Sequence, residues 1–176
     1  MYLKPLRPAA ASRVPMRRRV LLGLVATLVA HHAISTPAAL GAGQNAAPAM
    51  VRELHLGANF PAVVLTTVLL TQTFKMLVVE AGSEKARRIA VSHVDAVIPK
   101  YQAQWDRNLA AAYAEHFTAR EMLSIVQEKQ ASPYAKALQE RERDVGVSMQ
   151  RRSSDLLSKV ATEVLAGAYA EVTAKQ

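Results

Sequence analysis

The sequence predicts an all-α fold, a small bundle of five or six antiparallel helices that follows a cleaved signal peptide. Alanine is frequent, whereas the 176 residues include seven glycines. Beyond Pro48, only Pro61, Pro99 and Pro133 interrupt the chain, and apolar residues recur at spacings of three and four, which is typical of helices. The chain contains no Asn-Gly or Asp-Gly pair of the kind that marks a β-hairpin.

The N-terminal region has the three parts of a secretory signal. A basic triplet, Arg17–Arg19, runs into the apolar block Val20–Ala30, and small residues with Pro37 follow. The block is shorter than the ~20 residues that cross a bilayer. We therefore expect cleavage rather than a permanent anchor, after Gly41 or Gly43.

These features divide the chain into three parts. Residues 1–43 are the predicted signal peptide, with Met16 as an alternative start. Residues 44–50 are expected to be a flexible leader, and residues 51–176 a single helical domain. We expect a Sec-type export route and a periplasmic location.

The charge of the chain is concentrated in the predicted signal. The whole sequence has 22 basic and 14 acidic residues, but residues 1–43 hold six of the basic residues and no acidic one. The remaining domain is nearly neutral and lacks the basic surface that nucleic acid binding requires. The absence of cysteine excludes disulfides, thiolate metal sites and a cysteine nucleophile.

The first predicted helices of the domain are Val51–Ala58 and a second that opens at Phe60-Pro61, since proline is favoured in a first helical turn. The second contains the apolar segment Val63–Val79. We interpret this segment as a buried helix rather than a membrane span, because Gln72 and Lys75 lie within it.

Gly82-Ser83 separates that helix from the next, Glu84–Val97. The residue before a proline is disfavoured in a helix, so we expect a break at Pro99 and a new helix from there to about His116. Its buried face is expected to contain residues at helical spacing, namely Leu109, Ala112, Tyr113 and Phe117.

Two local signals start the last helices. Thr118 and Glu121 have the spacing of a capping box, in which each side chain bonds to the backbone N–H of the other residue. Ser132-Pro133 predicts the start of a final helix that runs to about Val172, with Gly146 as a weak point. Its apolar stripe is Leu138, Val145, Met149, Leu156 and Val160.

From Trp105 to about Val164, a third of the chain, the sequence resembles a bacterial envelope family known as domain-of-unknown-function family 2059. The matching residues are the run 113–122, then Ser132-Pro133, then a long amphipathic helix. The resemblance implies an exported all-helical domain without an established activity. The motif residues are expected to be structural: Tyr113, Phe117, Thr118, Glu121, Ser132 and Pro133. The chain departs from the family pattern at Glu128-Lys129-Gln130, where an aromatic pair is expected, and at Ala135, where glycine is favoured.

The sequence offers little evidence of catalysis. His55, His93 and His116 are scattered, and the adjacent Glu115 and His116 are expected to point apart on a helix, so we predict no metal site and no cofactor. No Gly-x-Ser-x-Gly elbow occurs. The charged run 140–144 has the composition of a solvated helix face.

We therefore expect no enzyme but a binding or interaction module, with an unknown envelope protein or a second copy of the chain as its partner. The alternative is a carrier of an apolar or lipid ligand, held in a cavity lined by Val63–Val79. Tyr101 and Trp105 are candidates for a ligand groove or for the edge of the core. A third hypothesis is an envelope hydrolase around Glu115, His116 and Glu121.

Overall fold

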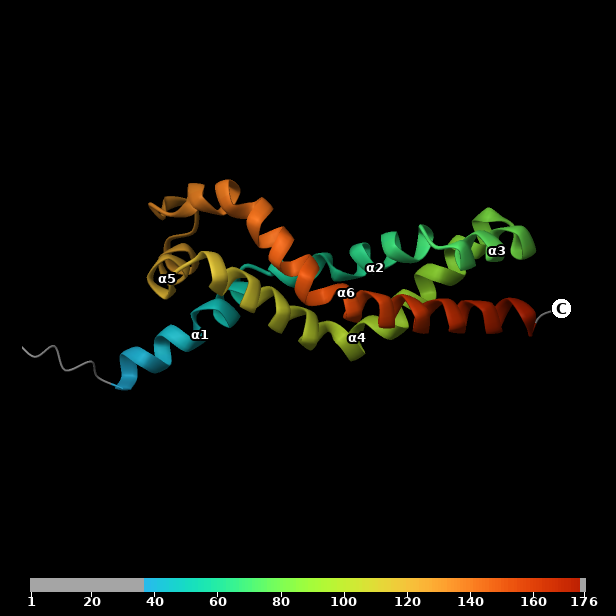
Figure 1. Ribbon diagram of the computed structural model, residues 1–176, viewed down its shortest axis with the longest axis horizontal. Coiled ribbons are helices and arrows are strands. Elements are labelled where there is room, and N and C mark those ends of the chain that lie inside the picture. Colours follow the sequence, from blue (N-terminus) through green and yellow to red (C-terminus); the bar gives the residue numbers. More distant parts are fainter. Residues whose placement is uncertain (1–36, 175–176) are drawn as a thin grey trace, which may run out of the picture. The chain divides into compact units, whose positions relative to one another are not determined.

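The computed structural model describes residues 37–174, and in that part of the chain all regular structure is helical (Figure 1). The all-α prediction is confirmed. In chain order the elements are α1 (Pro37–Glu53), the 3-10 turn η1 (Leu56–Asn59), α2 (Phe60–Leu69), α3 (Gln72–Ala81), α4 (Ser83–His116), α5 (Ala119–Glu128), the 3-10 turn η2 (Lys129–Ala131) and α6 (Ala135–Thr173).

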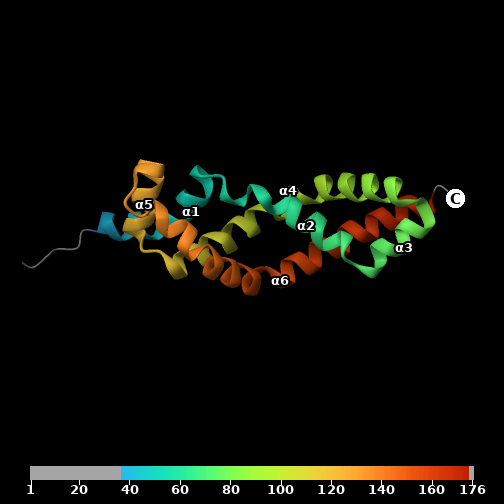
Figure 2. The ribbon, with the colours of Figure 1, turned by 90° about the horizontal axis from the view of Figure 1, so that it is seen from above.

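The two long helices, α4 and α6, pack antiparallel, and their ribbons run in opposite directions in Figures 1 and 2. Side-chain bonds define the register. His93 Nε2 lies 3.2 Å from Glu171, the Tyr101 hydroxyl donates to Glu163 at 2.6 Å, and Asn108 donates to Ser153 at 3.0 Å. Residue numbers rise along α4 as they fall along α6, which is the pattern of an antiparallel helix pair.

The core follows the same pair of helices. On α6 the buried residues recur at helical spacing, and Val160, Val164 and Ala168 are fully buried. The apolar stripe predicted for α6 is confirmed in position, since Val145, Met149, Leu156 and Val160 are buried and Leu138 is partly buried against them. Helix α6 is unbroken at Gly146.

The prediction of a flexible leader at residues 44–50 is wrong. These residues lie in α1, where Ala46, Ala47 and Met50 are buried in the core. They share one face because Met50 follows Ala47 by three positions and Ala46 by four. Of the predicted signal peptide, residues 1–36 lie outside the described part of the chain, and residues 37–43 begin α1. The predicted first helix, Val51–Ala58, is also corrected: α1 ends at Glu53, and η1 follows.

The apolar segment Val63–Val79 is two helices rather than one. Helix α2 begins at Phe60 as predicted, but α3 starts anew at Gln72, because Thr71 caps it: the Thr71 hydroxyl oxygen accepts the Phe74 N–H at 3.1 Å. The apolar stretches on the two sides of this break meet at 77°. A single threonine cap gives a weak sequence signal within an otherwise apolar pattern.

The predicted break at Pro99 is wrong, since α4 continues through it. Pro99 is exposed, and it lacks the backbone N–H that would otherwise donate to the Asp95 backbone carbonyl. Buried residues continue on both sides of it, at Val94, Ile98 and Tyr101. Packing of this continuous face against the rest of the core outweighs the preference of the residue before a proline for a non-helical backbone.

The capping box of α5 is confirmed. The Glu121 N–H donates to the Thr118 hydroxyl oxygen at 3.3 Å, and the Thr118 N–H donates to the Glu121 carboxylate at 2.7 Å. At the next start, Ser132 is buried and its hydroxyl oxygen accepts the Tyr134 N–H at 3.2 Å. The regular α-helix begins at Ala135, two residues after the predicted start at Pro133.

Removing the cap tests how much it contributes. We expect Thr118→Ala to lower the free energy of unfolding by about 1 kcal/mol, because the first turn of α5 loses its side-chain acceptor. Urea denaturation followed by circular dichroism measures the change. Thr66→Ala is the matched control, since the Thr66 hydroxyl bonds inside α2, to the Ala62 carbonyl at 2.9 Å. Equal stability of the Thr118→Ala variant and the unmodified protein would contradict the capping role.

Candidate functional site

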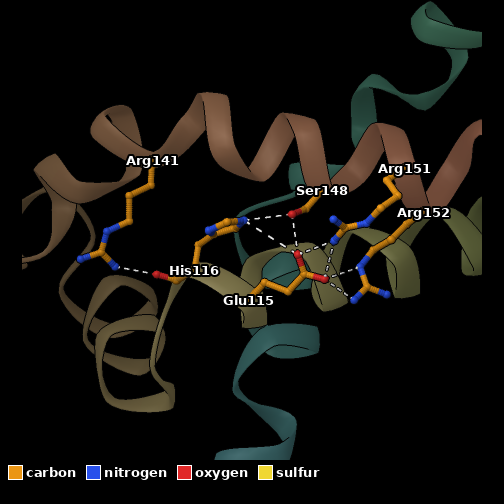
Figure 3. Close-up of polar contacts among 6 residues, drawn as sticks. All are labelled: Glu115, His116, Arg141, Ser148, Arg151 and Arg152. Carbon is orange, nitrogen blue, oxygen red and sulfur yellow. Dashed lines mark hydrogen bonds and ion pairs between the residues drawn. The ribbon is translucent and has the colours of Figure 1, made fainter.

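A polar cluster joins the end of α4 to α6 (Figure 3). Glu115 and His116 do not point apart as predicted, because both reach Ser148. The Ser148 hydroxyl donates to the Glu115 carboxylate, and His116 Nε2 lies 3.0 Å from the same hydroxyl oxygen. Arg151 and Arg152 complete the cluster, each donating to Glu115 at 3.0 Å.

The surroundings of Glu115 favour its charged form. The hydrogen bond from Ser148, followed by the one from Arg152, lowers the pKa of Glu115 to about 2, and the charges of Arg151 and Arg152 act in the same direction. The carboxylate is therefore ionised throughout the neutral range and is a very weak base.

The cluster contains the residue types of a hydrolase triad but not its arrangement. In a triad the acid bonds to the histidine, and the histidine takes the proton of the serine. Here the Ser148 hydroxyl donates its hydrogen bond to the acid itself, which leaves His116 Nε2–H to donate to the serine oxygen. Ser148 is 4 % exposed, so its oxygen is closed to a substrate. This geometry suits a hydrogen-bonded link between α4 and α6 better than a catalytic nucleophile.

Two of the predicted motif residues, Phe117 and Glu121, contact Arg141, a residue that the sequence pattern places on a solvated face. Its guanidinium lies 4.8 Å from the centre of the Phe117 ring and donates to the His116 carbonyl at 2.7 Å and to Glu121 at 3.2 Å. The Phe117 ring in turn lies 5.9 Å from that of Tyr113. Ser132 and the exposed Pro133 belong instead to the turn before α6, where Ser132 bonds to Ser124. These contacts are structural in character.

An apolar groove of about 380 Å³ lies between η1, α2, α4 and α6. Glu142 is the one charged residue that lines it. The remaining lining residues are uncharged: Leu56, Asn59, Val63, Trp105, Leu109, Tyr113, Val145, Gly146, Met149, Gln150, Ser153 and Leu157. Of the segment that the carrier hypothesis placed around a cavity, Val63 alone is part of this lining.

The pair Tyr101 and Trp105 divides between two environments. Trp105 lines the groove, and its ring stacks on Phe60 with 4.7 Å between the ring centres and 18° between the planes. Tyr101 instead bonds to Glu163, and the amines of Lys100 and Lys159 lie over its ring at 5.1 and 5.5 Å. The sequence therefore identified one groove residue of the two.

A second cavity, of about 450 Å³, lies where the end of α1 and η1 meet α4. Its polar lining is mixed in charge, with Arg52, Arg107, His55 and Asp106. Gln102 Nε2 donates to the Gly57 carbonyl at 3.1 Å and to Asp106 at 2.8 Å, so these acceptors have partners within the protein. None of the buried side-chain nitrogen or oxygen atoms described for this cavity lacks a hydrogen-bond partner.

Among residues 37–174, no group of three or more His, Cys, Asp or Glu side chains is placed to hold a metal ion. The described part also contains no single helix that is long and apolar enough to cross a membrane. The bent pair Leu56–Leu69 and Gln72–Ala81 passes that test by length and composition together.

No protein-family model matches the chain, and comparisons with curated proteins and with solved structures give no significant match. The resemblance to family 2059 therefore stays a prediction.

Because Glu115 is ionised in its contacts with α6, the stability that these contacts contribute is sensitive to acid. The folded pKa of Glu115 is about 2 against an ordinary 4.5, so the carboxylate stabilises the fold above pH 4.5, and this contribution is lost as the pH falls toward 2. We expect Glu115→Gln to be less stable than the unmodified protein at neutral pH, with a difference that disappears near pH 2.

Urea denaturation at several pH values measures this difference. The control is Glu140→Gln, since Glu140 forms an exposed pair with Lys136 at 3.1 Å on a single helix, where such pairs contribute little. A stability difference for Glu115→Gln that is the same at pH 7 and pH 2 would show that the charge is not its cause.

Proposed function

We propose that the described domain is a non-catalytic binding module that takes a small apolar ligand in the groove between α2, α4 and α6. The observation that carries this proposal is the composition of the groove wall. Leucine, valine, methionine and aromatic side chains make up most of the wall around about 380 Å³, together with the uncharged polar residues Asn59, Gln150 and Ser153 and one charged residue. Ligand sites of proteins are typically concave and apolar, with a few polar groups that orient the ligand.

The arrangement at Ser148 supports the non-catalytic part of the proposal. A hydrolase needs an accessible nucleophile beside a base that can take its proton. The buried Ser148 donates instead to Glu115, whose pKa of about 2 makes it unsuited to general base catalysis at neutral pH.

Blocking the groove tests the proposal. Gly146 lines the groove, and a Cβ there meets no atom within 4 Å, so the side chain of a Gly146→Leu variant has room to occupy part of the groove opening without a clash. Leucine also favours a helix more than glycine does, so we expect the variant to keep the fold. The matched control is Ala166→Leu, which adds a leucine to an exposed position of α6 outside the groove.

Fluorescence titration with the neutral probe N-phenylnaphthylamine measures binding to the protein as cells produce it. We expect Gly146→Leu to weaken binding roughly tenfold, ~1.4 kcal/mol, and Ala166→Leu to leave it unchanged. Absence of binding to the unmodified protein, or equal binding to all three, would refute the proposal.

We also propose that the domain is exported to the periplasm after removal of its N-terminal leader. The basic triplet Arg17–Arg19 before the apolar block Val20–Ala30 supports this proposal, and a cut after Gly41 or Gly43 leaves the buried Ala46, Ala47 and Met50 in the domain. Sequencing the N-terminus of protein recovered from cells tests it. We expect the first residue to lie within 42–44, and a chain that retains Arg17–Arg19 would refute the cleavage.

A further inference from the structure

Helix α3 has an unusual exposed side. Its buried residues, Phe74 and Leu77, belong to the core, and the exposed positions opposite them follow the helical spacing i, i+3, i+4, i+7. These four exposed residues, which we call the outer face of α3, are Gln72, Lys75, Met76 and Val79. A helix that packs on a core normally exposes polar residues, but half of this face is apolar.

The apolar residues of this region are exposed to an unusual degree. Val79 at 86 % and Leu70 at 76 % are the two most exposed large apolar side chains in the described part of the chain. Leu70 directly precedes the cap of α3. Met76 is 52 % exposed and lies three positions before Val79, so the two are neighbours on the helix. Isolated exposed apolar residues are common, whereas three within ten positions indicate a contact surface.

The bent pair of helices that passes the composition test for a membrane span is packed inside the protein. Val64 and Val68 of α2 are buried in the same core as Phe74 and Leu77 of α3. Contact with a bilayer leaves this core intact if it uses the exposed apolar side chains alone. Such contact is interfacial and does not span the membrane.

The charge around the outer face is positive. Lys75 lies on the face itself, one position before Met76 and four before Val79. Residues 72–89, which cover α3 and the first turns of α4, hold four basic residues, all exposed, against two acidic ones. Figures 1 and 2 show α3 and the start of α4 at the end of the α4–α6 pair opposite α5. Apolar side chains beside lysine and arginine are typical of surfaces that bind anionic membranes.

We propose that the outer face of α3, together with Leu70, docks on the surface of a bilayer that contains anionic lipids. Leu70, Met76 and Val79 enter the boundary between headgroups and acyl chains, and Lys75 pairs with lipid phosphate. The inference is independent of the proposed function, because no residue of the outer face lines the groove.

Another protein fits this surface less well than a bilayer does. Three apolar side chains are far fewer than the roughly 20 residues a side of a stable protein interface. In a symmetric dimer through this face, both copies would contribute a positive Lys75, and neither face would contribute an acidic residue. An anionic bilayer supplies phosphate to the lysine and accepts apolar side chains without a shaped pocket.

The first test places a fluorescent label on the outer face in the protein as cells produce it. The chain contains no cysteine, so Val79→Cys provides a single site for the environment-sensitive dye nitrobenzoxadiazole. Val147→Cys is the matched control. Val147 is an exposed valine of α6, at 57 %, that does not line the groove, and its neighbour Ser148 bonds to the far end of α4.

Vesicles of phosphatidylcholine with phosphatidylglycerol are added to both labelled proteins. We expect the emission of the label at position 79 to shift to the blue, as it does when the dye leaves water, and the emission at position 147 to stay unchanged. Equal shifts at both positions, or no shift at position 79, would overturn the inference. The same shift at position 79 with phosphatidylcholine alone would overturn it too, since the docking would then need no anionic lipid.

Vesicle sedimentation measures the contribution of each side chain. We expect Val79→Glu to lower the partition coefficient roughly tenfold, because it replaces an apolar contact with a negative charge beside anionic lipid. Lys75→Gln should lower it roughly fivefold at low salt and much less at high salt. The controls Val147→Glu and Lys136→Gln make the same changes at exposed positions of α6 and should have little effect. Equal losses in the controls and in the outer-face variants would contradict docking through α3.

Two further outcomes are decided by the same proteins. Should Val79→Glu not fold, as judged by circular dichroism, the label at position 79 still answers the question. A dimer of the unmodified protein that Val79→Glu abolishes, detected by sedimentation equilibrium in the absence of any vesicle binding, would assign the outer face to a second copy and overturn the inference.

Discussion

The antiparallel packing of α4 against α6 determines where the other features of the molecule lie. It brings Glu115 beside Ser148 at one end of the pair and His93 beside Glu171 at the other. It also places Trp105 on α4 opposite Met149 and its neighbours on α6, where α2 completes the groove. A shift of one helix along the other by a single turn would separate all of these pairs at once.

Apolar burial and polar pairing contribute differently to this packing. Fully buried residues such as Val160 and Val164 provide most of the stability, because each removes apolar surface from water. Exposed ion pairs along the seam, such as that of Lys100 with Glu163, contribute little on average. Their effect is on specificity, since a buried hydroxyl such as that of Ser148 finds partners in one register and would lose them in another.

The sequence predicted well what depends on neighbouring residues. The capping box at Thr118, the helix start at Phe60 and the end of a helix before Gly82 depend on a few adjacent positions. Sequence-based prediction failed where the structure depends on contacts between residues that are far apart in the sequence. Packing keeps α4 continuous across Pro99, and the convergence of Glu115 on Ser148 depends on the register of α4 and α6. The spacing of apolar residues along the sequence predicts which face of each helix is buried. It does not predict which residues of two buried faces contact each other.

The register of α4 and α6 also has a consequence for the order of folding. Its contacts close loops of very different length, since Glu115 and Ser148 are 33 positions apart in the sequence but His93 and Glu171 are 78 positions apart. By the loop-closure relation, the longer closure costs about 0.8 kcal/mol more if it forms first. Once the ends next to α5 have met, each later contact extends an existing hairpin. Loop-closure entropy therefore favours forming the α4–α6 contacts next to α5 first, and those at the other ends of the two helices later.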